Sequence, residues 1–232
     1  MAQAIISIPG LLSDRRVFEP CSEFLSDYSW THFQRSDACS LSQWGSEVVS
    51  SADEPSIFFG HSMGARVALE AWRLAPERCS GLILADFGVD GLVTEQERAG
   101  RERRVRLASE VGMEALIDDW LRPMVAPSFV QNPGFSVLSD MLLNENSKSH
   151  ERQIQALLDR PDAATYLGSI NIPVLLLVGE DDAWSPVAQH QAIADELACS
   201  QLTVIEGAGH FLPFEKPYEV AQVIERWVSQ YL

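Results

Sequence analysis

A serine stands between two glycines in the sequence Gly-His-Ser-Met-Gly at positions 60–64. The apolar run Ser56–Phe59 precedes it and a helical pattern follows it, which is typical of a strand, a sharp turn and a helix. Such a turn exposes the serine hydroxyl for nucleophilic attack, and it needs glycine where a side chain would collide with the backbone. The pattern therefore indicates that Ser62 is a candidate nucleophile.

A serine hydroxyl is a weak nucleophile at neutral pH and needs a base, for which histidine titrates in a suitable range. His210 follows the candidate strand Gln201–Ile205 within the sequence Gly-Ala-Gly-His. This position predicts a loop at the carboxyl end of a strand, the edge of the sheet at which Ser62 also lies. We therefore expect His210 to be the base. The other histidines are His32, His61, which should point away across the turn, His150 in a helical insertion and His190 on a helix.

The base in turn needs a carboxylate that orients its ring and stabilises its positive charge. Three carboxylates follow the apolar run that ends at Val178, within Gly-Glu-Asp-Asp-Ala-Trp-Ser-Pro at positions 179–186. Asp182 is the predicted partner, with Asp181 as the second choice. Asp86, directly after the candidate strand Gly81–Ala85, is an alternative because its strand end should lie nearer to the nucleophile.

Acyl transfer further requires backbone N–H groups directed at the negative charge that develops on the substrate oxygen. Met63, directly after the candidate nucleophile, should supply one of them from the first turn of a helix. Leu11 is expected to supply the second from the loop after the first strand, where Gly10 permits a close approach. Leu11 and Met63 are therefore the predicted oxyanion-hole residues.

Strand and helix patterns alternate along the chain, which indicates an α/β fold with a mostly parallel sheet flanked by helices. The apolar runs Leu82–Ala85 and Val174–Val178 are typical of strands buried on both faces. The candidate strands are Ala4–Ile8, Ser29–Phe33, Ser56–Phe59, Gly81–Ala85, Pro173–Val178 and Gln201–Ile205. The candidate helices outside the insertion are Phe18–Leu25, Leu41–Ser51, Ser62–Leu74, Pro186–Ala198 and Glu215–Tyr231.

The chain between about Gly88 and Asn171 contains helical patterns but no convincing strand. We expect an all-helical cap, residues 89–170, over the edge where ligands of open α/β sheets bind, and a core formed by residues 1–88 and 171–232. Five arginines from Arg98 to Arg106 alternate with glutamate and predict a solvated helix face. The candidate helices here are Thr94–Ser109, Met113–Leu121, Phe135–Leu143 and Ser149–Leu158.

Composition limits the classes of partner. The 232 residues carry a net charge of -16, with 46% hydrophobic and 22% charged residues, which suits one globular domain and disfavours nucleic acid or an anionic membrane surface. The four cysteines show no pairing or metal-binding spacing, so we expect reduced thiols and no metal site. No targeting segment or membrane-spanning run is visible in the sequence, and a soluble, cytoplasmic protein is expected.

Taken together, these motifs resemble the α/β-hydrolase superfamily, in the branch with a serine nucleophile and a helical cap. The resemblance rests on residues 60–64, 179–186 and on Gly-Ala-Gly-His-Phe-Leu-Pro-Phe-Glu-Lys-Pro at 207–217, in the chain order Ser62, Asp182, His210. It implies that these three residues form a catalytic triad, and that the full fold has an eight-stranded sheet. The chain departs from the family in having Pro9-Gly10 where His-Gly is common, and in lacking recognisable leading strands.

The serine at the turn favours acyl chemistry, because dehalogenases and epoxide hydrolases of the superfamily use aspartate there. We expect hydrolysis of a small to medium, mostly apolar carboxylic ester or thioester, without a cofactor. The alternatives are carbon–carbon bond hydrolysis of a ring-fission dione and a non-catalytic ligand-binding homologue. The expected partner is a small molecule, with a homodimer as a further possibility. The predicted substrate pocket contains Leu12, Phe87, Trp120, Met124, Phe129, Trp184 and Phe211.

Overall fold

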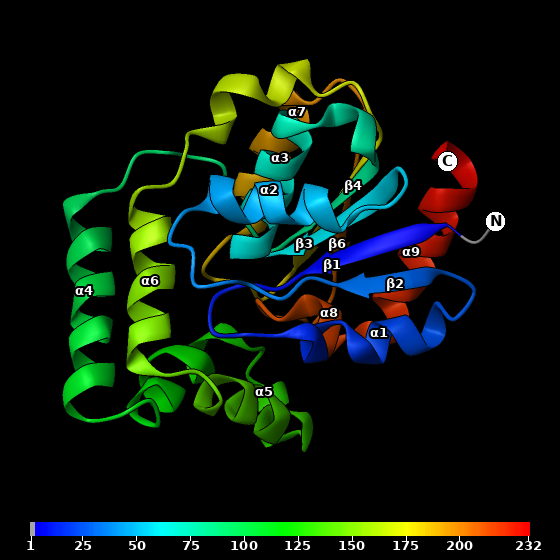
Figure 1. Cartoon of the computed structure of the whole chain (residues 1–232). Helices are drawn as coiled ribbons and strands as arrows, with labels where there is room; N and C mark the ends of the chain where they lie inside the picture. Colours follow the sequence, from blue (N-terminus) through cyan, green and yellow to red (C-terminus); the bar gives the residue numbers. More distant parts are fainter. Residues whose placement is uncertain (1–2) are drawn as a thin grey trace.

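A computed structural model describes residues 3–232 and shows a single sheet of six parallel strands (Figure 1). The strand order across the sheet is β2-β1-β3-β4-β5-β6, so β1 lies next to one edge, β2 forms that edge, and the later strands extend the sheet on the other side of β1. The strands are β1 (Ala4–Ile8), β2 (Ser29–His32), β3 (Ser56–His61), β4 (Cys79–Ala85), β5 (Val174–Gly179) and β6 (Ser200–Ile205).

The central strands are buried because helices cover both faces of the sheet. Every residue of β3 and β5 is buried, which explains their continuous apolar sequences. One face carries α2 (Leu41–Ser51), α3 (Met63–Leu74) and α7 (Val187–Glu196), and the other carries α1 (Glu19–Phe24), α8 (Leu212–Glu215) and α9 (Pro217–Tyr231), as Figure 1 shows. Short 3-10 turns lie at η1 (Arg15–Val17) and η2 (Pro76–Arg78).

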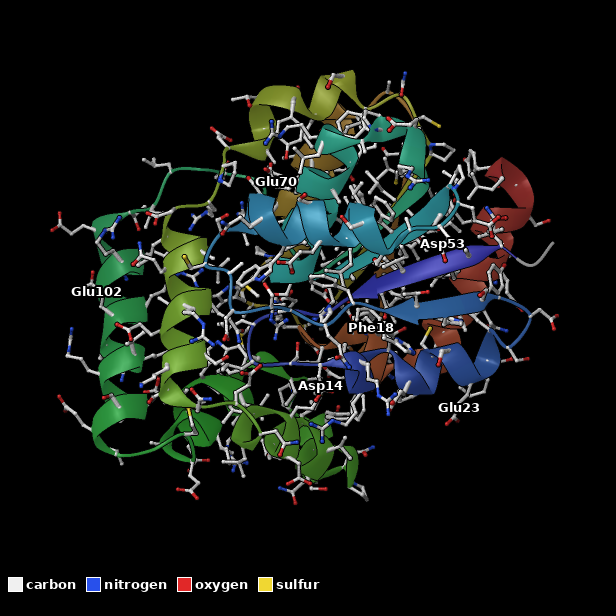
Figure 2. All side chains as sticks on the ribbon, in the orientation of Figure 1. Asp14, Phe18, Glu23, Asp53, Glu70 and Glu102 are labelled. Carbon is white, nitrogen blue, oxygen red and sulfur yellow. The ribbon has the colours of Figure 1, made fainter. Side chains whose placement is uncertain are left out.

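Local sequence explains where several of these helices begin. The Ser40 side chain accepts a hydrogen bond from the Gln43 N–H at the start of α2, and Pro217 is the first residue of α9. Phe18, at the start of α1, packs edge-on against Phe59 of β3 with 4.9 Å between ring centroids. Figure 2 shows Phe18 against the sheet, whereas Glu102 lies on the outer side of the insertion.

A helical insertion connects β4 to β5, and no strand occurs among its residues. Thr94 caps α4 by accepting a hydrogen bond from the Glu97 N–H, and α4 packs along α6 beside the sheet (Figure 1). The helical elements are α4 (Glu95–Glu110), η3 (Ile117–Leu121), η4 (Arg122–Met124), η5 (Phe129–Gln131), α5 (Gly134–Leu143), α6 (Ser147–Leu158) and η6 (Ala163–Ser169).

The predicted elements agree closely with the observed ones. All six strands are confirmed, and the sheet is smaller than the eight strands of the full family fold. The predicted helix Met113–Leu121 begins later than expected, at Ala115, and its residues Ile117–Leu121 form a π-helical turn. Within residues 3–232, no helix is long and apolar enough to span a bilayer.

Candidate active site

Ser62 occupies a strained turn between β3 and α3. Its φ of 55° and ψ of -119° lie in a region that side chains rarely adopt. A Cβ added at Gly60 would lie 2.4 Å from the Ala65 Cα, and one added at Gly64 would lie 1.9 Å from the Ile8 carbonyl oxygen. The two glycines are therefore required by the turn, as the sequence predicts, and the turn presents the Ser62 hydroxyl at the carboxyl edge of the sheet.

A continuous line of hydrogen bonds joins the three predicted triad residues. The Ser62 Oγ lies 2.8 Å from the His210 Nε2. The His210 Nδ1 lies 2.8 Å from the Asp182 Oδ2. His210 and Asp182 are both buried, whereas Ser62 is partly exposed. This arrangement can take a proton from the serine and stabilise the charge that forms on the imidazole.

Asp182 is held by its own loop as well as by His210. Its Oδ1 accepts hydrogen bonds from the Trp184 N–H at 2.8 Å and the Ser185 N–H at 3.0 Å, and its Oδ2 accepts one from the Ser185 hydroxyl at 2.5 Å. Burial raises the pKa of Asp182, but the charge and hydrogen bond of His210, with the Ser185 hydrogen bonds, outweigh it and hold that pKa below its usual value. Asp181, the second choice, is exposed to solvent.

The backbone of the His210 loop is fixed on both sides. The His210 N–H donates to the Met124 carbonyl at 2.7 Å, which ties the loop to the insertion. The buried Glu215 carboxylate accepts hydrogen bonds from the Gly209 N–H and the Phe211 N–H, each at 3.0 Å, and from the Ala126 N–H at 2.8 Å. Through these contacts Glu215 holds the loop that carries His210. The sequence gives no local signal for this role.

His61 lies behind His210 and does not compete for the serine. Its Nε2 is 2.6 Å from the His210 carbonyl oxygen, to which it donates as the neutral tautomer. Burial, together with the charge of His210, lowers the pKa of His61 to about 3, so the ring is uncharged at neutral pH. His61 therefore supports the His210 loop.

Asp86, the alternative carboxylate, contacts backbone groups and not the His210 ring. It accepts hydrogen bonds from the Gly179 N–H at 3.0 Å and the Leu212 N–H at 3.3 Å, and lies 3.9 Å from the His61 Nε2. Burial, with the nearby charge of Asp182, raises the pKa of Asp86 well above its usual value. Asp86 thus braces the loops around the site.

The two predicted oxyanion-hole donors flank Ser62. Within the described residues, neither the Leu11 N–H nor the Met63 N–H donates a hydrogen bond, and both residues line the cavity that contains Ser62. A Cβ at Gly10 would lie 3.0 Å from the Ser62 Cβ, so the loop approaches the serine closely. These N–H groups are available for a substrate oxygen.

The loop that carries Leu11 is braced by Arg35, whose side chain is 9% exposed. Arg35 donates to the carbonyl oxygens of Pro9 at 3.1 Å, Gly10 at 2.9 Å and Ser13 at 2.7 Å, and pairs with Glu145 of the insertion at 3.3 Å. The neighbouring Leu12 N–H donates to the Gln153 side chain at 2.9 Å. The sequence gives no local signal for these contacts, because Arg35 and Gln153 lie far from the loop along the chain.

The cavity beside Ser62 has a volume of about 340 Å³. Four predicted pocket residues line it, namely Phe87, Trp120, Met124 and Trp184. The other three predicted pocket residues, Leu12, Phe129 and Phe211, do not line the cavity, and the prediction is corrected for them. The Leu12 side chain is buried in the core, Phe129 packs against Phe214, and Phe211 packs behind the base against His61 and Trp120.

The cavity is also more polar than the sequence suggests. The additional lining residues include Arg66, Asp90, Glu97, Arg101, Arg160 and Gln189. The expectation that Arg98–Arg106 forms a solvated face is wrong for Arg101, whose side chain is only 11% exposed and pairs with Glu97 at 2.9 Å. The charged side of α4 turns partly inward because α4 packs on α6.

A larger cavity, of about 540 Å³, lies near Arg35 and is lined by Asp14, Arg16 and Glu145 among others. Neither Ser62 nor His210 borders it. We therefore assign the candidate site to the smaller cavity, which contains the hydrogen-bonded residues. Among residues 3–232, no group of three or more His, Cys, Asp or Glu side chains is arranged to hold a metal ion.

The sequence of this chain matches a known family over most of its length. The model described as "Alpha/beta hydrolase family" matches residues 7–223. The chain belongs to the α/β hydrolase family. Among curated proteins, this α/β hydrolase is 25% identical over 197 residues to 3-oxoadipate enol-lactonase 2 of Acinetobacter baylyi, a match that covers 82% of this chain and 72% of the relative.

Solved structures share the fold of this α/β hydrolase. A thermophilic esterase from Thermogutta terrifontis, solved with malate bound, has a TM-score of 0.90 and 22% identity, with 99% of this chain and 90% of that chain covered. The enol-lactonase from Burkholderia xenovorans LB400 has a TM-score of 0.87 and 17% identity, with 99% and 92% covered. At these identities the likeness shows the common fold.

Proposed function

We propose that this α/β hydrolase cleaves carboxylic esters or lactones through an acyl-enzyme on Ser62. The observation that carries the proposal is the line of two 2.8 Å hydrogen bonds from Ser62 through His210 to Asp182. A strained serine, a histidine nitrogen within hydrogen-bonding distance and an ionised carboxylate behind it are the parts that serine hydrolysis requires. The names of the similar proteins, an esterase and enol-lactonases, support the same class of substrate.

In the proposed mechanism, the Ser62 Oγ attacks the carbonyl carbon while its proton passes to the His210 Nε2. The Leu11 and Met63 N–H groups stabilise the oxyanion, and Asp182 stabilises the imidazolium. The intermediate collapses when the alcohol leaves with the proton from His210. Water then attacks the acyl-enzyme, its proton passes to His210, and the acid is released as Ser62 regains a proton.

We further propose that residues 89–170 act as a cap on the site formed by residues 1–88 and 171–232. Trp120, Met124, Leu157 and Arg160 of this segment line the same cavity as Ser62. The Met124 carbonyl also holds the His210 N–H. The segment therefore contributes both to the substrate pocket and to the position of the base.

The test is a panel of short 4-nitrophenyl esters and small lactones, with the Ser62→Ala variant as the control. We expect turnover by the wild type and a loss of at least about 10⁴-fold in kcat in the variant. Absence of turnover across the panel would overturn the proposal. Turnover of a ring-fission dione without ester hydrolysis would instead favour carbon–carbon bond cleavage.

A further inference from the structure

Arg66 lines the cavity that contains Ser62, and no carboxylate among residues 3–232 forms an ion pair with it. It lies one helical turn after Ser62 on α3. Among residues 3–232, Arg66 donates one hydrogen bond, from Nη1 to the Asp90 carbonyl oxygen at 3.2 Å, and has no ion-pair partner.

Two other arginines of the cavity share a single carboxylate. Arg160 donates to both oxygens of Glu97, at 2.7 and 2.9 Å, and Arg101 donates to the same carboxylate at 2.9 Å. Arg160 also donates to the Asp90 carbonyl oxygen at 2.8 Å, which places it next to Arg66. Glu97 thus hydrogen-bonds to Arg160 and Arg101 but not to Arg66, which it attracts only from a distance, as Asp90 does.

The remaining carboxyl groups of the cavity do not form an ion pair with Arg66 either. Asp86 faces the N–H groups of Gly179 and Leu212, and burial raises its pKa. The Asp90 side chain is exposed to solvent and makes no ion pair within the described residues. The end of the cavity near Arg66 is therefore locally positive in a chain whose net charge is -16.

The isolation of Arg66 is energetically unfavourable in the absence of an anion. Burial, followed by the charges of Arg160 and Arg101, outweighs the attraction of Asp90 and Glu97 and lowers the pKa of Arg66 to about 10, so the group remains charged at neutral pH. A partly buried cation without a partner is costly, and a bound carboxylate would offset that cost with a bidentate, charge-assisted hydrogen bond.

We infer that Arg66 binds a carboxylate of the substrate, so that the site accepts esters or lactones whose acyl part carries a second, acidic group. One free guanidinium matches one carboxylate. The Gln189 side-chain amide provides a further donor near Arg66, because both side chains approach Gly88. A Cβ placed on Gly88 would lie 2.0 Å from the Gln189 Nε2 and 3.5 Å from the Arg66 Nη2. The inference rests on the proposed function, because it names the class of ester for the same site.

The test compares monoethyl glutarate with ethyl 5-methylhexanoate, a neutral ester of the same shape, by the release of ethanol. We expect the wild type to prefer the anionic ester in kcat/KM. In Arg66→Met the ratio of the two kcat/KM values should fall about 30-fold, and in Arg66→Lys, which keeps the charge but loses the fork, about fivefold. Arg73→Met is the matched control, because Arg73 lies on α3 outside the cavity and pairs with Glu70.

An unchanged ratio in Arg66→Met, or a wild type that prefers the neutral ester, would overturn the inference. If the wild type hydrolyses neither ester, the proposed function fails for these substrates but the binding site can still be tested. Calorimetric titration of monoethyl glutarate into Ser62→Ala should then show affinity that falls at least about tenfold in Ser62→Ala/Arg66→Met. Equal affinity in the two variants would overturn the inference independently.

Discussion

The loop after β5 and the turn after β4 each bury one aspartate at the same edge of the sheet, but the two carboxylates have opposite surroundings. Asp182 accepts a hydrogen bond from the His210 ring, which carries positive charge during the proposed reaction. Asp86 contacts only backbone N–H groups and lies beside a histidine that stays neutral. As a result the pKa of Asp182 is lowered and that of Asp86 is raised.

The difference shows that burial alone does not decide the role of a carboxylate. Desolvation raises the pKa of both groups, and it is the partner that determines the outcome. Asp182 is stabilised as an anion and can therefore stabilise a positive charge on the His210 ring. Asp86 links the end of β5 to the loop of the base through the N–H groups of Gly179 and Leu212, which is a structural task.

The largest expected effect separates the two aspartates by activity. Asp182→Asn should lower kcat by about 10⁴-fold, because the amide cannot hold the productive tautomer or stabilise the imidazolium. Asp86→Asn should lower kcat by less than about tenfold, because it alters only the packing of the loops. Ester hydrolysis by both variants measures this, with Asp181→Asn as the exposed neighbour control. Equal losses at positions 182 and 86 would refute the comparison.

Glu215 sharpens the comparison as a third buried carboxylate that contacts backbone only. Burial raises its pKa despite three N–H hydrogen bonds. Glu215→Gln replaces an acceptor oxygen with a donor and should lower kcat about 20-fold through displacement of His210, with KM changed by less than about threefold. A rise in KM without a fall in kcat would show that Glu215 shapes the substrate pocket and does not position His210.

Ser185 tests how far Asp182 depends on its own loop. Its hydroxyl donates to the Asp182 Oδ2 at 2.5 Å and lies 3.4 Å from the His210 Nδ1. Ser185→Ala should lower kcat about fivefold, which corresponds to one lost hydrogen bond of about 1 kcal/mol. The rate of ester hydrolysis against pH should keep its shape, and a shifted profile would mean that Ser185 takes part in proton transfer.

The smallest expected effect is on stability and has opposite pH dependence for the two aspartates. The raised pKa of Asp86 means that its contribution to the free energy of unfolding is complete below about pH 4 and is lost as the pH rises towards the raised value. The free energy of unfolding of Asp86→Asn, relative to that of the wild type, should therefore increase as the pH rises above about 4.

The lowered pKa of Asp182 means that its contribution is present above about pH 4 and is lost as the pH falls. The deficit of Asp182→Asn relative to the wild type should therefore shrink as the pH falls below about 4. Urea denaturation of the two variants and the wild type, at pH values both below and above about 4, measures both trends. If the free energies of unfolding of the two variants, each relative to the wild type, changed in the same way with pH, the opposite environments assigned to Asp86 and Asp182 would be contradicted.

The sequence predicted those parts of the site whose residues lie within short motifs. Ser62, Asp182 and His210 each follow a strand, and parallel strands bring their carboxyl ends to one edge, so local patterns sufficed to place them together. Asp86 also follows a strand, and only the three-dimensional contacts show that Asp182, and not Asp86, is hydrogen-bonded to His210.

The contacts made across the fold could not be predicted in this way. Glu215, Arg35 and Gln153 act on loops that lie distant in sequence or in another part of the fold, and no local pattern encodes such pairs. Arg101 looked like part of a solvated helix face, because the packing of α4 against α6 is not visible in the charge pattern. The polar side of the pocket was missed for the same reason.

Covalent labelling tests the central claim most directly. A fluorophosphonate that mimics the tetrahedral intermediate should react with the wild type and, to a reduced extent, with Asp86→Asn, and peptide mass spectrometry should find the adduct on Ser62. Asp182→Asn should react far more slowly, and Ser62→Ala should not react. A label on another residue, or labelling of Ser62→Ala to the same extent as the wild type, would contradict the account.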